Sequence, residues 1–279
     1  MKIYVHTDIE GCAGYVFYAQ MDMSKAEVRA FNARMNALLT NEVVAACEAA
    51  LESGASEVYV NDAHGPCYNI DFERLPAGCR IINGRAGHFD AWLSMLDESF
   101  DAMICIGQHA MAGTPHSVCP HSLWHVNDDL KLSETTMAAA MAGCKGVPTI
   151  MVSGDDKICA EVREKIPGVH AAVVKRAIAA QNACSLAPVE ACELIRETVR
   201  AAIADRGNIP PYVVPGPLRL NISNRNPAER LIPPDVEGDE IRETPPRALH
   251  QPHPHFGDAP TDDRPSPRPR LPRPHPPRT

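Results

Sequence analysis

The chain has 279 residues, of which 44% are hydrophobic, and a formal net charge of -8. This length allows one large α/β domain or two small domains, and the apolar content is ample for a core. The acidic balance excludes a general nucleic-acid binder, because phosphate neutralisation needs an excess of Lys and Arg, so we expect a small substrate.

The N-terminal segment MKIYVHTDIEG reads as a short strand that ends in Asp8 and Glu10. These two acids interrupt the apolar run far too early for a signal peptide or a membrane span. We therefore expect a cytoplasmic protein without a membrane partner. A long helix should follow, because residues 24–27, SKAE, have the form of a capping box and Gly54 supplies the stop.

Four further segments read as strands. In chain order they are SEVYVNDAHG, DAMICIGQHAMAG, VPTIMVSGDD and HAAVVKRAI. The continuous apolar stretches VYV and AMICI are typical of strands that are buried on both faces. Helical patterns around Phe89 to Leu96, at 134–143 and at 189–203 alternate with the strands. This alternation predicts a three-layer α/β domain with a mostly parallel central sheet.

From about Pro245 the character of the sequence changes. The segment PSPRPRLPRPHPPRT has no periodic apolar residues, and its prolines forbid a helix. We predict an α/β domain over residues 1–244 and a disordered Pro/Arg-rich tail over residues 245–279 that adds nothing to catalysis. The alternative is that this tail is the polyproline ligand of a non-catalytic interaction protein.

The ten cysteines show no paired spacing and no CxxC motif. Several of them lie within apolar helix or strand patterns, so we expect free buried thiols rather than disulfides or thiolate metal ligands. No phosphate-loop or dinucleotide glycine pattern occurs, which leaves nucleotide chemistry unsupported.

Three of the predicted strands end in polar side chains. Asp8 and Glu10 lie in TDIEG, His64 lies in NDAHG, and His109 lies in GQHAMAG. Because the carboxyl ends of neighbouring parallel strands converge on one crevice, we expect these side chains to meet there. A single histidine is more often a core or surface residue than a ligand, so the prediction rests on the coincidence of all three strand ends. Two carboxylates held side by side need a cation.

The ligand types indicate which metal binds. Carboxylates combined with imidazoles suit zinc or manganese rather than calcium. Glu134, at the start of the next helix, is a fifth candidate ligand, although a helix N-terminus attracts acids in any case. Five ligands exceed the needs of one catalytic zinc, so we predict a binuclear site that holds two metal ions, with Asp8 as the candidate bridge.

The segment AGTPHSVCPHSLWHVND contains too many turn residues to be core and is predicted to be a loop. It carries His116, His121 and His125, any of which could transfer protons near neutral pH or be a solvated loop histidine. Farther along, Asp155 and Asp156 end a strand. These acids could contribute to the crevice or cap the next helix.

The segments DIEG, VNDAHG, GQHAMAGTP, PHS and VPTIMVSGDD occur in this order over roughly residues 1–216. In these segments the chain resembles the zinc D-aminopeptidases of bacterial dipeptide-transport operons. By this resemblance the family's metal ligands fall on Asp8, Glu10, His64, His109 and Glu134. Its proposed catalytic residue falls on His121. The resemblance implies two zinc ions per subunit, a ring-shaped decamer that encloses its active sites, and short peptide substrates with an N-terminal D-amino acid, such as D-Ala-D-Ala.

Two features depart from the family pattern. The stretch between His121 and Glu134 is shorter than usual, and a polar stretch followed by the Pro/Arg tail stands after Ile232, where the family has a strand and an apolar helix. Two other functions stay open at this point. One is a binuclear phosphoesterase, since paired metals serve both chemistries, and the other is the non-catalytic interaction protein.

Overall fold

The computed structural model describes residues 1–17, 24–84, 92–127, 129–223 and 237–238. These residues all belong to one compact unit that spans Met1–Leu249. The predicted tail at 245–279 lies outside the described residues, and its disorder stays a prediction.

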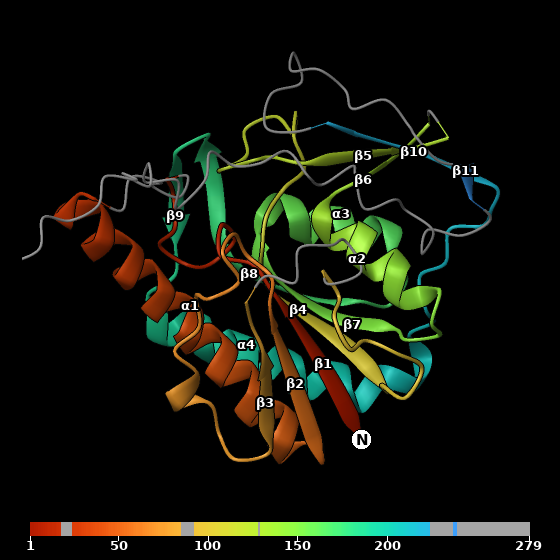
Figure 1. Cartoon of the computed structure of the whole chain (residues 1–279), viewed down its shortest axis with the longest axis horizontal. Coiled ribbons are helices and arrows are strands. Elements are labelled where there is room, and N and C mark those ends of the chain that lie inside the picture. The colour runs from red at the N-terminus through yellow and green to blue at the C-terminus, as the bar shows by residue number, and fades with distance from the viewer. Residues whose placement is uncertain (18–23, 85–91, 128, 224–236, 239–279) are drawn as a thin grey trace, which may run out of the picture. The chain divides into compact units, whose positions relative to one another are not determined.

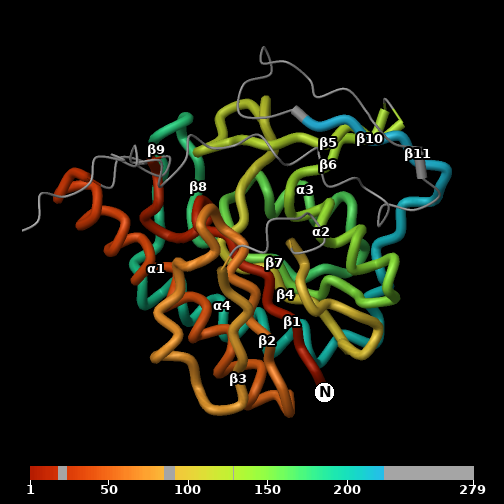
Figure 2. The backbone as a smooth tube through the Cα atoms, in the orientation of Figure 1, coloured from red at the N-terminus to blue at the C-terminus, as the bar shows by residue number. Residues whose placement is uncertain are grey.

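The centre of the unit is a seven-stranded sheet in the order β3-β2-β1-β4-β7-β8-β9. Its strands are β1 (Lys2–Thr7), β2 (Glu57–Asp62), β3 (Cys79–Ile82), β4 (Ala102–Gln108), β7 (Thr149–Asp155), β8 (His170–Ala179) and β9 (Asn182–Ser185). All neighbours pair in parallel except β8 and β9, which are antiparallel. The predicted, mostly parallel sheet is therefore confirmed, and the N-terminal strand β1 lies in its interior, between β2 and β4 (Figure 2).

Helices cover both faces of this sheet (Figure 1). One face packs against α1 (Ala26–Glu52) and α4 (Pro188–Asp205), and the other packs against α2 (Glu134–Gly143) and α3 (Asp156–Lys165). In β4, Ile104 and Ile106 join the first core while Met103 and Cys105 join the second. Because successive side chains of a strand point to opposite faces, a strand covered on both sides must be apolar throughout. The three predicted layers follow from this pattern.

The ends of two predicted helices need correction. α1 begins after Lys25 without any side-chain cap, so the expected capping box at residues 24–27 does not form. Gly54 does end the helix, with a φ of +94° that other residues rarely adopt. The helix predicted around Phe89 to Leu96 is absent from its described part, where residues 92–95 form turns. Residues 89–91 lie outside the described residues.

A second, smaller sheet has the order β11-β10-β5-β6. Its strands are β5 (Leu123–Val126), β6 (Leu130–Leu132), β10 (Leu218–Ser223) and β11 (Glu237–Gly238). The loop predicted between His109 and Glu134 is therefore wrong at β5, where Trp124 is only 2% exposed. The partner of β5 on one side is β10, which lies far away in the chain, so local sequence gives no sign of the pairing.

Close approach of the strand ends depends on glycine. A Cβ atom added to Gly154 would lie 2.0 Å from the backbone oxygen of Gln108 and 2.8 Å from a methyl carbon of Ile158. We expect Gly154→Ala to destabilise the protein by about 2 kcal/mol or more, because the backbone oxygen cannot move aside as a side chain can. Urea unfolding measures this change.

Gly207→Ala is the matched control, because no described atom beyond its two chain neighbours lies within 4 Å of a Cβ at that position. It should change the free energy of unfolding by less than about 1 kcal/mol. Equal stability of the two variants would contradict the tight contact at Gly154.

Candidate metal centre

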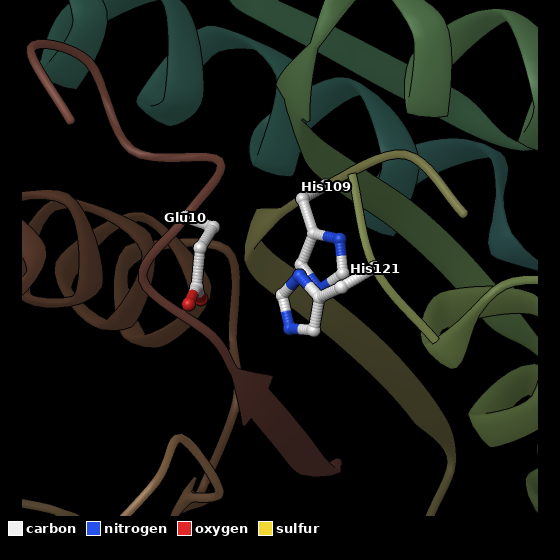
Figure 3. Close-up of side chains that lie close together, drawn as sticks. All are labelled: Glu10, His109 and His121. Carbon is white, nitrogen blue, oxygen red and sulfur yellow. The ribbon is translucent and has the colours of Figure 1, made fainter. Parts of the chain in front are cut away.

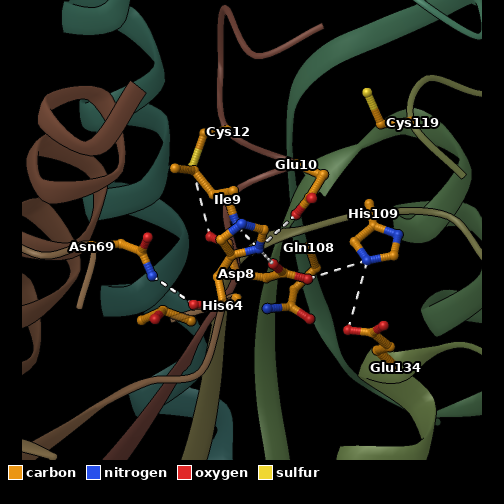
Figure 4. Close-up of polar contacts among 12 residues, drawn as sticks. Asp8, Ile9, Glu10, Cys12, His64, Asn69, Gln108, His109, Cys119 and Glu134 are labelled. Carbon is orange, nitrogen blue, oxygen red and sulfur yellow. Dashed lines mark hydrogen bonds and ion pairs between the residues drawn. The ribbon is translucent and has the colours of Figure 1, made fainter. Parts of the chain in front are cut away.

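The predicted ligands lie together at the carboxyl edge of the sheet (Figure 4). Asp8 and Glu10 follow β1, while His64 follows β2, and His109 follows β4. These three strands are direct neighbours, so their ends meet at one place. Glu134 reaches the same place as the first residue of α2, despite the short stretch of chain before it.

The side chains form groups of three whose potential ligand atoms lie within 4.8 Å of one another. One group contains Asp8, Glu10 and His64, and a second contains Asp8, His109 and Glu134. Together these two groups hold all the predicted ligands, and they share Asp8.

In the first group an imidazole nitrogen faces two carboxylates. His64 Nδ1 lies 2.9 Å from Asp8 Oδ1 and 3.0 Å from Glu10 Oε2. Burial disfavours the charged imidazolium, but the carboxylates of Glu10 and Asp8 outweigh burial and hold the pKa of His64 well above its ordinary value. A positive charge is therefore favoured between these groups.

In the second group the orientation of His109 tests whether a metal fits. Its Nδ1–H donates to the carbonyl of Ala110 at 2.9 Å, so in the neutral ring Nε2 carries the lone pair. That Nε2 atom lies 3.1 Å from Asp8 Oδ2 and 3.7 Å from Glu134 Oε2, and it is buried without a hydrogen bond. Neutral His109 would point a lone pair at two acceptors. A proton or a metal ion resolves this conflict, and an imidazole whose other nitrogen donates to a carbonyl is the usual form of a metal-binding histidine.

Glu10 gives a second indication, because its buried Oε2 has His64 Nδ1 as an ion-pair partner but makes no hydrogen bond among the described residues. Carboxylate and imidazole atoms that converge in this way fit zinc as a donor set. Glu134, His64 and His121 keep 22%, 13% and 13% of their side chains exposed, whereas Asp8, Glu10 and His109 are almost fully covered. The centre is therefore open to solvent on the side of the first three.

His121 packs directly on this centre. Its ring stacks on that of His109, with centroids 3.9 Å apart and planes inclined by 10° (Figure 3). His121 forms a third group with Glu10 and His109, and its Nε2 lies 3.8 Å from Glu134 Oε1. Burial and the neighbouring His109 lower the pKa of His121, which favours the neutral ring.

The other two histidines of the segment lie elsewhere. His116 is exposed with a φ of 52°, and His125 belongs to β5. Neither joins a potential ligand group among the residues that the structure describes. Asp155 caps α3 by accepting hydrogen bonds from the Lys157 and Ile158 amides. Helix capping is one of the two roles predicted for it.

The residues that hold the ligands in place are not recognisable from the sequence. Asp62 accepts hydrogen bonds from the backbone amides of Asn69 and Ile70 at 2.5 and 2.9 Å. Asn69 Nδ2 in turn donates to the carbonyl of His64 at 2.7 Å. Asp62 is part of the NDAHG segment, but nothing in that segment shows that its carboxylate closes the loop beyond His64.

The described residues include no helix that is both long and apolar enough to cross a membrane. No disulfide joins the ten cysteines, all of which are described, but only five of them are buried as predicted, and Cys184 is exposed. The sheet and the side chains at its strand ends fit a metal-dependent hydrolase that is built on a mostly parallel α/β sheet.

Comparisons with known proteins narrow this class. A model of the D-aminopeptidase family, Peptidase M55, matches residues 1–231. A D-aminopeptidase of Bacillus subtilis (strain 168) is 31% identical over 252 residues, which cover 87% of this chain and 88% of that protein. The chain belongs to the D-aminopeptidase family and is a metallo-aminopeptidase.

A solved structure supports the same assignment. It is described as the Zn-dependent D-aminopeptidase DppA from Bacillus subtilis, a self-compartmentalizing protease. It is 27% identical in sequence and has a TM-score of 0.76, covering 88% of this chain and 94% of that chain. The α/β fold predicted from the sequence is thus that of a known aminopeptidase.

Proposed function

We propose that this protein is a binuclear zinc aminopeptidase that removes the N-terminal D-amino acid from short peptides such as D-Ala-D-Ala. The observation that carries the proposal is the position of Asp8, which belongs to both of the ligand groups that hold the predicted ligands. Zinc follows from the mixed carboxylate and imidazole donors and from the zinc dependence of the related DppA.

In this proposal Asp8, Glu10 and His64 hold one zinc ion, and Asp8, His109 and Glu134 hold the other. Zinc held by these residues would supply an activated water molecule and a Lewis acid for the scissile carbonyl. The chain's own contribution is to fix the ligand atoms. The carbonyl of Ala110 orients the His109 ring, and Asn69 holds the backbone of His64.

His121 is the group that we assign to proton transfer. Its Nδ1–H donates to the carbonyl of Cys119 at 3.0 Å, so Nε2 is the nitrogen that takes up a proton. Nε2 is directed toward Glu134, at the edge of the centre that stays partly exposed. From there His121 accepts the proton of the attacking water and returns it to the leaving amine.

The oligomeric state is a further part of the proposal. The description of DppA as self-compartmentalizing favours a homo-oligomer, and we propose the ring-shaped decamer that the sequence resemblance implies.

The test is hydrolysis of paired substrates by protein depleted of metal and then reloaded with zinc. We expect cleavage of D-Ala-D-Ala after zinc is restored and little cleavage before. L-Ala-L-Ala, which has the same composition, should be cleaved at least about tenfold more slowly, because a wrongly placed methyl group costs 1–3 kcal/mol.

A phosphodiester serves as the control for the other metal chemistry. Preferred cleavage of the phosphodiester would support a phosphoesterase instead, and equal rates on both dipeptides would contradict the D-specificity. Zinc-independent cleavage would overturn the metal centre itself.

A further inference from the structure

Lys175 is a fully buried lysine on β8 that has no part in the chemistry described above. It is 1% exposed. A bulge places it there: Gly154 of β7 pairs with Val173, but Asp155 pairs with Lys175, so Val174 is an extra residue. The bulge breaks the alternation of faces, and Val174 and Lys175 are both buried in succession. Because a buried charge needs compensation, its partners indicate its role.

The partners are two backbone carbonyls of one turn. The Lys175 ammonium donates to the carbonyl of Glu10 and, at 2.6 Å, to that of Tyr15. We call residues 10–15 the Glu10 turn. Its first and last carbonyls thus converge on one ammonium that is 165 and 160 residues away in the chain. The carboxylate of Glu10, at the start of this turn, belongs to two of the potential ligand groups.

The amide groups of the turn are held by other elements. The Gly11 N–H donates to the carbonyl of Gly107 at 2.8 Å. The Ala13 N–H donates to Glu42 Oε1 on α1, also at 2.8 Å. The Glu10 turn is therefore fixed between a cation that binds its carbonyls and acceptors that bind its amides.

The surroundings of the ammonium are acidic and buried. Asp155 and Glu42 are 0% and 2% exposed, and each keeps one buried oxygen without a hydrogen bond. Burial lowers the pKa of Lys175, while Asp155 and Glu42 are among the groups that oppose this shift. Burial also raises the pKa of Glu42 to about 7. A neutral side chain at position 175 would leave two carbonyls unpaired and both acids without a neighbouring positive charge.

We propose that Lys175 is a positioning residue for zinc binding, which fixes the Glu10 turn so that the Glu10 carboxylate is presented to its metal ion. This inference rests on the proposed binuclear centre and goes beyond its ligands. Groups that orient a metal ligand typically change metal affinity by about 10- to 100-fold when they are removed.

The test is zinc titration of metal-free Lys175→Met, followed by competition with a chromophoric chelator. Methionine has a similar length and volume but no charge and no donor. We expect one of the two zinc ions to bind about 10- to 100-fold more weakly. The other, which Glu10 does not ligate, should keep its affinity to within about twofold. Activity lost at low zinc should return at saturating zinc, which a general loss of structure would not allow.

Val58→Ala is the matched control. Val58 is fully buried in β2. It lies at the amino end of the strand, whereas the metal centre lies at the carboxyl edge of the sheet. This variant should lower the melting temperature and bind both zinc ions as the wild type does. If Val58→Ala weakens zinc binding as Lys175→Met does, the effect is one of stability and the proposal is wrong.

Lys175→Gln, which keeps an N–H donor without the charge, covers the case in which the methionine variant does not fold. It should weaken the same zinc ion. Failure of both variants to fold, under conditions in which Val58→Ala folds, would make Lys175 a stability residue and overturn the proposal.

The failure of this inference differs from that of the proposed function. If the wild type binds two zinc ions and cleaves D-Ala-D-Ala while Lys175→Met binds both ions with unchanged affinity, only the role of Lys175 is wrong. If the wild type binds fewer than two, the binuclear centre fails and the role of Lys175 fails with it.

Discussion

Replacement of Asp8 by alanine is expected to abolish peptide hydrolysis and leave the fold intact. Asp8 joins the two groups that contain the predicted ligands, so its removal takes a ligand from both zinc ions at once. Metal ions supply several kcal/mol of transition-state stabilisation, and their loss should lower kcat/KM by about 10³-fold or more. Hydrolysis of D-Ala-D-Ala and elemental analysis of the purified variant measure the two effects.

Glu164→Ala is the control for Asp8→Ala, since Glu164 is an exposed acid on α3. It should keep full activity and full zinc content, and both variants should give the far-UV circular dichroism of the wild type. Full zinc occupancy in Asp8→Ala would count heavily against a bridging carboxylate. Loss of the dichroism signal in that variant alone would show that Asp8 is needed for folding.

Replacement of His121 by alanine should lower kcat by about 10² to 10⁴ and leave the zinc content unchanged. The hydrogen bond from Nδ1–H to the Cys119 carbonyl fixes the ring with Nε2 as the proton acceptor. The five proposed ligands do not include His121, so both zinc ions should stay bound. Steady-state kinetics and zinc analysis on the same sample separate the two roles.

His116→Asn provides the comparison for His121→Ala. His116 lies in the same segment but is exposed, and asparagine tolerates its φ of 52°. This variant should keep kcat within about twofold of the wild type. Loss of zinc together with activity in His121→Ala would make His121 a ligand, and unchanged kinetics would make it a bystander.

The sequence is informative about the sheet for a simple physical reason. A strand covered by helices on both faces has to be apolar throughout, so β1, β2, β4 and β7 are visible as continuous runs. Their polar ends stand out against these runs. The small sheet cannot be predicted in this way, because β5 pairs with β10, which lies far away in the sequence. Neither strand has a local pattern that indicates its partner.

The helix expected around Phe89 to Leu96 shows where periodicity misleads. Leu93 and Leu96 are buried, at 5% and 4% exposed, but from turns in which Met95 has a φ of 64°. Apolar spacing therefore records burial, and several backbone conformations satisfy it. The capping motif at residues 24–27 misleads in a similar way. It forms a capping box only if Ser24 is the N-cap residue, whereas the N-cap residue of α1 is Lys25.

The sequence by itself determined that the metal-binding side chains stand at the ends of strands and meet at one edge of the sheet. Local patterns set the strand boundaries, and parallel strands bring their carboxyl ends to one edge. Only the tertiary structure decided how these side chains divide into ligand groups. It shows that Asp8 belongs to both ligand groups and that His121, rather than His116, stacks on His109. It also brings Lys175 to the Glu10 turn across 165 residues of chain. Such contacts depend on how the layers pack and on the bulge at Val174 in β8, and the neighbouring sequence predicts neither of them.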